Sequence, residues 1–345
     1  MTTQSFRRPF HGMGDFLHAC MNFRDGSGDD RLVMQAVAGL GSATGSSGGF
    51  LMQEDLAEGL WRQVQQHGRI IRRCRLQPVT GRGATLSVPA IDERSRANGS
   101  RLGGVALKWV KPGELLPQSK PGFSTIRFEP KKLAGVVYAT DELIDDIPAF
   151  AAYFEQSAAG EVAFDVEDAI IGGTGVGEPL GIANSPAAIE VSKEDGQAAS
   201  TIHPVNFAKM AARLWSASHD NAVWLMSNEV YEAVLNIPTS EWFEGIVTAA
   251  DGRRRLQQIP VELCEYTAPL GQRGDVVLAD FSQYALSERK QAAGVLQSIH
   301  VRFIHDETAF RVVARVDGAP LWASPITPKN GESTQSPFVL LGARE

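Results

Sequence analysis

The segment from residue 78 to residue 128 places the strongest constraint on this chain, because it is long yet too poor in apolar side chains to form a core of its own. Three short pieces in it alternate apolar and polar residues, as strands do: TLSVPAI at 85–91, GVALKWV at 104–110 and FSTIRF at 123–128. The pattern predicts a long β-hairpin that projects from the body. A two-stranded ribbon is marginally stable in water, so we expect a neighbouring subunit to cover it; a mobile surface loop is the alternative.

Residues 148–171 form the second long feature. Apolar side chains recur there at helical spacing over six turns, at Phe150, Phe154, Ala158, Val162, Val166 and Ile170. The acidic residues of this stretch, Glu155, Glu161, Asp165, Glu167 and Asp168, are expected largely on the other faces. Pro148 suits a first helical turn. The pattern predicts one long helix with an apolar stripe that ends at Gly172.

The remaining segments indicate an α+β fold. Residues 1–49 include the flexible run GLGSATGSSGG and look like an arm, and residues 50–77 contain a helical pattern. Residues 201–316 alternate helix and strand candidates, with Asn228 expected to cap the helix NEVYEAVLNI. The segment PFVLLG predicts a last strand.

Composition excludes several classes of protein. Hydrophobic residues make up 43% and charged residues 21% of the chain, which is typical of a folded globular protein. No apolar run approaches the roughly 20 residues that a membrane span needs. The three cysteines are far apart and form no C-x-x-C pair, so neither a disulfide framework nor a zinc cluster is indicated. We therefore expect a soluble, unsecreted protein.

Charge is distributed unevenly. The net charge of −7 argues against a general nucleic-acid binder. Residues 60–132, however, carry 15 Lys/Arg against 4 Asp/Glu, a net of +11, whereas residues 133–200 carry one lysine against 13 acids, a net of −12. The two segments are either separate solvated faces or complementary surfaces that meet between copies of the protein.

The glycine-rich stretch IIGGTGVGEPLGIANSP, residues 170–186, suggests a phosphate-binding loop at first sight. It fails the G-x-G-x-x-G pattern, because Glu178 and Leu180 stand where glycines are needed, and it lacks the P-loop lysine. It also follows a helix C-terminus, where the dipole is negative. We interpret its residues as a structural turn, formed by Gly172, Gly173, Gly175, Gly177, Pro179 and Gly181.

No catalytic constellation is evident either. Ser47 formally matches the G-x-S-x-G pattern of hydrolases, but it lies in a Gly/Ser run with no strand before it. The seven histidines show no metal-ligand spacing. The sequence predicts no enzyme activity, no cofactor and no metal.

The order of parts resembles the major capsid protein of tailed bacteriophages, the Hong Kong 97-type fold family. The segment GTGVGEPLGIANSPAAI is similar to the GTG-x-x-x-PLGI segment that follows that family's spine helix. The stretch from SVPAIDERS to YATDELIDD resembles its extended loop and return strand. DVVLADFSQYALSERKQAAGVLQSIHVRFIHDETAFRVVARVDG is similar to the end of its axial domain.

The resemblance implies a division into parts. The N-terminal arm would be 1–49, the extended loop 78–128 and the axial domain 201–308. The peripheral domain would combine 50–77, 129–200 and 309–345, with the spine helix at about 148–171.

The resemblance also gives the charge asymmetry a role, in which the basic loop of one subunit lies over the acidic surface of the next. The implied contact residues are Arg94, Arg96, Arg101, Lys108, Lys111 and Lys120 on the loop and Glu155, Glu161, Asp165 and Asp168 on the helix. Each such pair contributes about 0–1 kcal/mol, and a shell repeats it hundreds of times.

The expected function is that of a major capsid protein, which self-assembles into pentamers and hexamers and forms an icosahedral shell around double-stranded phage DNA. The expected location is the virion capsid, assembled in the bacterial host cytoplasm. Portal, scaffold or decoration proteins and non-specifically packaged DNA are the expected partners, with no membrane. The alternatives are an encapsulin-like or gene-transfer-particle shell and, from a different class, a serine hydrolase using Ser47.

Overall fold

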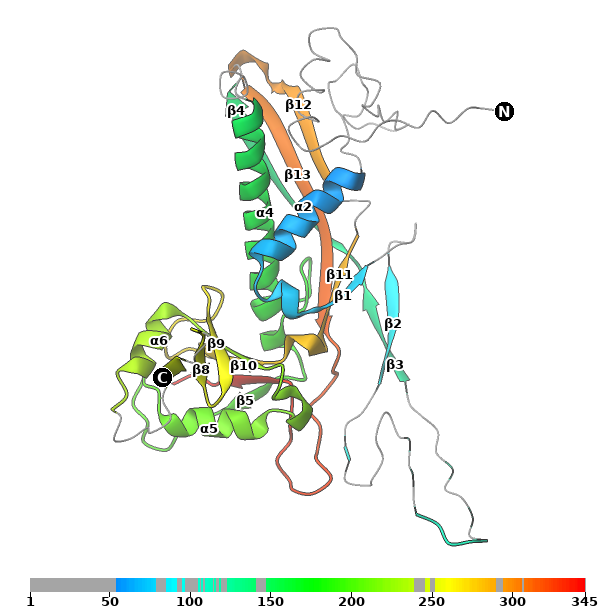
Figure 1. Cartoon of the computed structure of the whole chain (residues 1–345), viewed down its shortest axis with the longest axis vertical. Helices are drawn as coiled ribbons and strands as arrows, with labels where there is room; N and C mark the ends of the chain where they lie inside the picture. The colour runs from blue at the N-terminus through cyan, green and yellow to red at the C-terminus, as the bar shows by residue number, and fades with distance from the viewer. Residues whose placement is uncertain are drawn as a thin grey trace.

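The computed structural model describes the chain between residues 54 and 344, with gaps. The described ranges are 54–78, 85–91, 95–96, 105, 107, 109–113, 115, 118, 123–140, 147–238, 246–248, 252–289, 294–305 and 307–344. The expected arm, residues 1–49, lies outside them. An elongated body of sheet and helix carries a second lobe at one end and a separate two-stranded ribbon at its side (Figure 1).

A five-stranded sheet runs along the body. Its strands are β1 (Arg75–Pro78), β4 (Lys131–Thr140), β11 (Tyr284–Glu288), β12 (Gly294–Arg302) and β13 (Glu307–Pro320). β13 is central: β4 pairs with one of its edges, and β12 and β11 share the other. β1 then adds to β11 in parallel. The central position of β13 explains its long hydrophobic pattern, because the inner face of this strand is covered along its whole length.

The alternation of β4 and β13 decides which face of the sheet is buried. Leu133 and Val137 of β4 stand opposite Ala314 and Phe310 of β13 in an antiparallel register. Phe310 and Ala314 are buried in the main hydrophobic cluster. Because side chains alternate between the two faces of a strand, Leu133 and Val137 share this face, while Val136 points to the opposite one.

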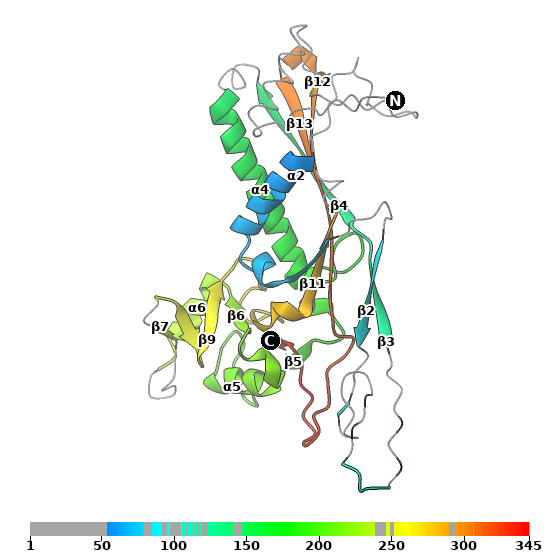
Figure 2. The same cartoon turned by 45° about the vertical axis from the view of Figure 1, so that its right-hand side comes forward.

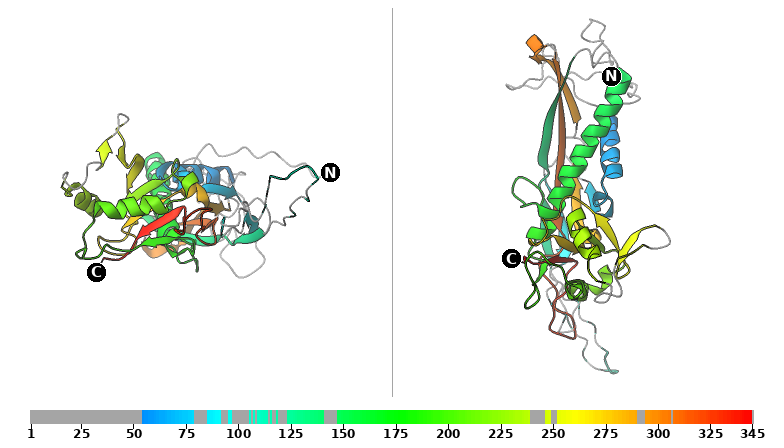
Figure 3. Two further views of the ribbon diagram at one scale, coloured as in Figure 1. Left: turned by 90° about the horizontal axis from the view of Figure 1, so that it is seen from below. Right: turned by 90° about the vertical axis from the view of Figure 1, so that its left-hand side faces the viewer.

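Two helices cover the buried face, as the right-hand view of Figure 3 shows. They are α2 (Glu54–His67) and α4 (Ile147–Gly172). The predicted long helix of residues 148–171 is confirmed to within one residue at each end. Phe154, Val162, Val166 and Ile170 of its predicted stripe are buried. No helix within the described ranges is long and apolar enough to cross a membrane.

Glu167 corrects the expected distribution of acids on this helix, because it faces the core and is only 4% exposed. Its Oε1 accepts hydrogen bonds from the backbone nitrogens of Ile70 (2.6 Å) and Ile71 (3.1 Å). These nitrogens stand at the start of the short 3-10 helix η2 (Ile71–Arg73), which follows α2. The carboxylate thus supplies the acceptors that the first N–H groups of a helix lack.

The second lobe is built on a seven-stranded sheet. In spatial order its strands are β5 (Ile189–Val191), β14 (Phe338–Leu341), β10 (Val276–Ala279), β6 (Val223–Met226), β9 (Ile259–Leu263), β8 (Arg254–Leu256) and β7 (Val247–Thr248). Helices α5 (Pro204–Arg213) and α6 (Asn228–Leu235) pack on it. Ser227, not Asn228 as expected, caps α6, because its side chain accepts a hydrogen bond from the Val230 nitrogen.

A buried ion pair lies at the edge of this lobe. The side chains of Arg344 and Asp275 are fully buried and joined by two hydrogen bonds, one of them 3.1 Å long between Nη1 and Oδ1. Arg344 Nε also donates to the Thr201 carbonyl at 2.6 Å. Asp275 accepts from the backbone nitrogens of Gly271 and Val276. The pair therefore ties Arg344 to two segments of the lobe, one at Thr201 and one at 271–276.

Strand pairing joins segments from different parts of the expected division into domains. β11 and β12 lie within 201–308, the expected axial domain, yet both pair with β13 of the body. β5 and β14 lie in the expected peripheral segments, yet they belong to the sheet of the second lobe. The chain crosses between the lobes several times, and a strand's own pattern does not specify its partner. The division into domains thus stays a prediction.

The projecting hairpin contains two strands, β2 (Leu86–Ile91) and β3 (Phe123–Phe128). They pair with each other in an antiparallel register from Leu86↔Phe128 to Ile91↔Phe123 and form a sheet of their own (Figure 2). Of the described positions in the predicted strand at 104–110, Val105 forms an isolated bridge, whereas Leu107, Trp109 and Val110 are not in a strand. Within the described part of the chain these three residues pair with no strand, and alternation alone does not make a strand.

The glycine-rich stretch folds back on itself where α4 ends. Gly175 and Gly177 have positive φ angles of 83° and 77°. A Cβ added to Gly173 would lie 2.3 Å from the Pro179 oxygen, too close for any side chain. The Glu178 carboxylate accepts from the Thr174 nitrogen at 2.8 Å, so an acid of the loop itself takes a donor that an anion would need.

Candidate inter-subunit surface

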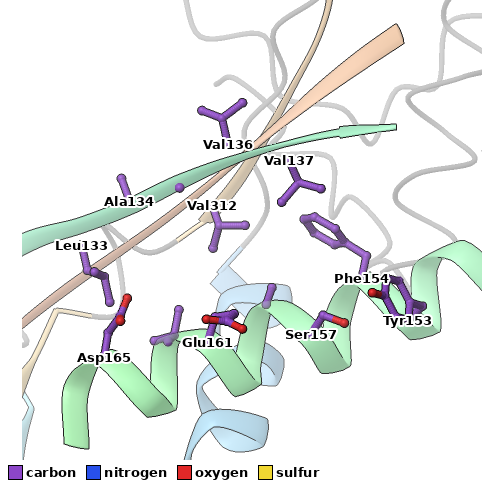
Figure 4. Close-up of a pocket in the computed structure, with 13 residues that line it drawn as sticks. Leu133, Ala134, Val136, Val137, Tyr153, Phe154, Ser157, Glu161, Asp165 and Val312 are labelled. Atoms are coloured by element: carbon purple, nitrogen blue, oxygen red, sulfur yellow. The ribbon is translucent and has the colours of Figure 1, made fainter. Parts of the chain in front are cut away.

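A groove of about 420 Å³ lies between β4 and α4 (Figure 4). Val137 of the strand and Phe154 of the helix point toward each other across it, while Val136 points away. Ala158 and Val162 continue the helical wall because residues four apart share one helix face. Val312 of β13 forms the floor. The side-chain periodicities of the strand and of the helix thus place mostly apolar residues along the groove.

Apolar side chains along this groove remain exposed. Tyr153 of α4 is 69% exposed and Val137 is 44% exposed. On the outer face of β4, Val136 and Tyr138 are exposed as well. Exposed large apolar side chains of this kind, next to charged residues, are typical of a surface that binds another protein.

Acidic side chains line the helix side of the groove. Glu161 and Asp165 are both exposed and project from α4 into the view of Figure 4. Asp168 follows outside the groove, and its pKa is raised by partial burial and by the nearby charges of Asp165 and Glu178. Partial burial also raises the pKa of Glu155. The structure therefore brings two of the four predicted acids to the groove and leaves a local excess of negative charge that a basic partner would relieve.

The basic candidates are only partly described. Arg96 lies against its own chain: its guanidinium is 5.9 Å from the centre of the Trp215 ring, and its backbone nitrogen donates to the Thr327 carbonyl at 2.9 Å. Lys111 is exposed on the loop. Arg94, Arg101, Lys108 and Lys120 lie outside the described residues. Of the two basic candidates that the structure describes, Arg96 is oriented inward and Lys111 lies at the surface.

The loop also exposes large apolar side chains that the sequence analysis did not single out as contacts. Trp109 is 100% exposed, Leu107 is 91% exposed and Leu115 is 86% exposed. Figures 1 and 2 both place the described parts of this loop beyond the end of the β2–β3 ribbon, away from the groove of the same chain. The sequence signal for this contact was a tryptophan in a segment that has no hydrophobic core of its own, because burying such a large apolar side chain against another surface is favourable.

The described residues offer no alternative chemical centre. They contain no group of three or more His, Cys, Asp or Glu side chains that would hold a metal ion. Ser47, the candidate nucleophile, lies outside the described residues. Cys74 is buried next to Glu167, and this burial raises the pKa of its thiol well above the usual range. A thiol in that state is a poor nucleophile.

Comparison with known proteins decides the family. The model of the phage capsid family matches residues 48–330. The chain belongs to the phage capsid family. A search of curated proteins finds no match. The expected resemblance, the α+β capsid fold and the expected function of a major capsid protein that forms a shell are confirmed.

Solved capsid structures share the fold of this capsid protein at low sequence identity. The capsid of an empty GTA particle is 18% identical, with a TM-score of 0.59 over 81% of this chain and 90% of that one. A chain from Mycobacterium phage Adephagia is 14% identical, with a TM-score of 0.51 over 80% and 89%. A chain of the satellite phage P4 procapsid, which includes a size-determination protein, is 9% identical, with a TM-score of 0.51 over 83% and 99%. At these identities the likeness establishes the fold.

Proposed function

We propose that this capsid protein assembles as pentamers and hexamers into an icosahedral shell around double-stranded phage DNA. In this proposal it acts as a structural protein and not as an enzyme, and the shell is assembled in the bacterial host cytoplasm. Portal, scaffold or decoration proteins complete the particle. Membership of the phage capsid family supports the shell itself.

The fully exposed Trp109 is the observation that carries the contact between subunits. Burying its ring in a partner would remove a large apolar surface from water, and exposed aromatic anchors of this kind often dominate protein interfaces. We assign it to the groove between α4 and β4 of the neighbouring subunit. That groove offers apolar walls, and the hairpin of its own chain extends away from it.

Charge sets the register of this contact. Lys111 stands two residues after Trp109 on the loop, and Lys108 stands one residue before it. Glu161 and Asp165 line the groove that receives the ring. Opposite charges flanking an apolar anchor select one docking position, although each exposed pair contributes only about 0–1 kcal/mol. The other predicted contact residues on the loop and helix would lie farther from this centre.

Charge reversal on both sides tests the contact. Lys108→Glu with Lys111→Glu, or Glu161→Lys with Asp165→Lys, should each raise the critical concentration for shell assembly about tenfold, as expected for a loss of about 1.4 kcal/mol per subunit. The chain that carries all four substitutions should recover most of the loss, because the charges are again complementary. Light scattering and electron microscopy measure assembly, and an unchanged melting temperature excludes unfolding. If the fourfold variant assembles no better than either double variant, these residues do not pair.

The alternative functions differ from the proposed one in the contents of the shell or in an enzyme activity. An encapsulin-like shell would show the same subunit contacts but would hold protein cargo instead of DNA, and a gene-transfer particle is a variant of the DNA-filled shell. A serine hydrolase would lose its activity in a Ser47→Ala variant. No observation in the described part of the chain favours that activity over the shell.

A further inference from the structure

A second cavity, of about 460 Å³, lies on a different part of the molecule and carries an unusual concentration of positive charge. One wall is the turn after α2, with Arg69, Arg72 and Arg73, and the other is the β8–β9 hairpin of the second lobe, with Arg253, Arg254 and Glu262. The cavity therefore joins two segments almost 180 residues apart in a chain whose net charge is −7.

The residues that line this arginine pocket include one acid beside five arginines. Five arginines and one glutamate give a formal charge of +4. Glu262 contacts Arg73 at 3.1 Å and Arg69 at 3.8 Å. Bringing guanidinium groups together raises their mutual repulsion, and a bound anion would relieve it.

Several arginines are held in place by the fold. Glu167 accepts from the nitrogens of Ile70 and Ile71 and so fixes the turn that carries Arg72 and Arg73. Arg72 Nε donates to the Gly68 carbonyl at 2.8 Å. Arg254 lies 5.1 Å from the centre of the Tyr231 ring. Side chains that are already positioned lose less entropy when a ligand binds, so this arrangement favours recognition.

From this geometry we propose that the arginine pocket binds phosphate groups. Guanidinium groups present planar forks of N–H donors that match phosphate oxygens, and they stay charged at all relevant pH values. A carboxylate has only two oxygens; those of Glu262 lie 3.1 Å from Arg73 and 3.8 Å from Arg69. A phosphate has more oxygens in a tetrahedral arrangement and can accept from several arginines at once. Phosphate is therefore a better match for five arginines around one cavity than the carboxylates on the acidic helix of another subunit are.

The phosphate can come from the backbone of duplex DNA or from a small phosphate compound, and the pocket recognises what these ligands share. The inference goes beyond the proposed shell, because a single unassembled subunit can bind phosphate. It also locates positive charge that the net charge of the chain conceals.

Binding of the full chain to three probes tests the proposal: a short duplex DNA, inorganic phosphate and pyrophosphate. The pocket variant is Arg69→Gln with Arg253→Gln. The matched control is Arg62→Gln with Arg75→Gln, which removes two exposed arginines that do not line the pocket. We expect the pocket variant to bind duplex DNA about tenfold more weakly, and the slope of log affinity against log salt to fall by about two. The control should lose much less.

Glu262→Gln gives a change in the opposite direction, since removing the pocket's acid should tighten phosphate binding. Loss of duplex binding in the pocket variant assigns the phosphate to DNA, while loss of only inorganic phosphate or pyrophosphate binding assigns it to a small compound; both support the pocket. Equal loss in the pocket and control variants overturns it. Unchanged phosphate binding in the pocket variant also overturns the proposal. If that variant binds phosphate normally but fails to form shells, the arginines contact a second subunit instead. Melting temperatures confirm that the variants fold.

Discussion

Arg344→Met is expected to lower the free energy of unfolding by about 3–5 kcal/mol, because it leaves the Asp275 carboxylate buried without its partner. Both side chains are fully buried. Asp275 also accepts from the nitrogens of Gly271 and Val276, and so it cannot turn toward water without breaking those bonds. The Thr201 carbonyl loses its donor as well. Urea denaturation of the unassembled chain measures the change.

Lys209→Met is the matched control for this experiment. Lys209 pairs with Glu194 at 2.7 Å, but it is largely exposed, and its loss should cost no more than about 1 kcal/mol. A cost for Arg344→Met as small as that of the control would mean that the buried pair does not hold the second lobe together.

Glu167→Ala is expected to lower the free energy of unfolding by about 3 kcal/mol. The substitution removes the acceptor for the buried nitrogens of Ile70 and Ile71, and each buried donor left without a partner costs about 1–3 kcal/mol. It also releases η2 from α4. The loss should therefore be accompanied by faster hydrogen exchange in residues 68–74, which mass spectrometry measures.

Glu167→Gln separates the role of charge from the role of hydrogen bonding. Burial raises the pKa of Glu167, with hydrogen bonds from Ile71 and Ile70 opposing it. As pH rises above the unfolded pKa of about 4.3, the unfolded carboxyl ionises first, and the wild type loses stability until the folded carboxyl also ionises. Glutamine keeps an acceptor and does not ionise. The glutamine variant should therefore gain stability relative to the wild type over this window, and a difference that does not change with pH would contradict the assigned cause.

Local patterns were sufficient to predict the long elements. The spacing of apolar residues placed α4, and alternation placed β2 and β3, because these signals depend only on neighbours in the sequence. The third strand expected in the loop is not formed at Trp109, because alternation is a local signal and no strand among the described residues pairs with it. Glu167 was missed because an acid in an acidic helix resembles a solvent-facing residue until its partners are known.

Features that combine segments far apart in the chain could not be predicted from the sequence. β11 and β12 follow the second lobe in the chain but pair with β13, and no residue in them specifies that partner. The arginine pocket joins Arg72 to Arg253, and the sequence showed these only as two basic runs. The groove likewise needed the packing of α4 against β4 to show that Glu161 and Asp165 flank an apolar surface.

Electron microscopy of the purified full chain under assembly conditions tests the central claim most directly. We predict closed shells of uniform size, built from pentamers and hexamers, in which density for residues 105–115 of one subunit lies in the groove between α4 and β4 of the next. A stable monodisperse monomer under all assembly conditions would contradict the shell. Shells in which Trp109 points into solvent would contradict the proposed contact.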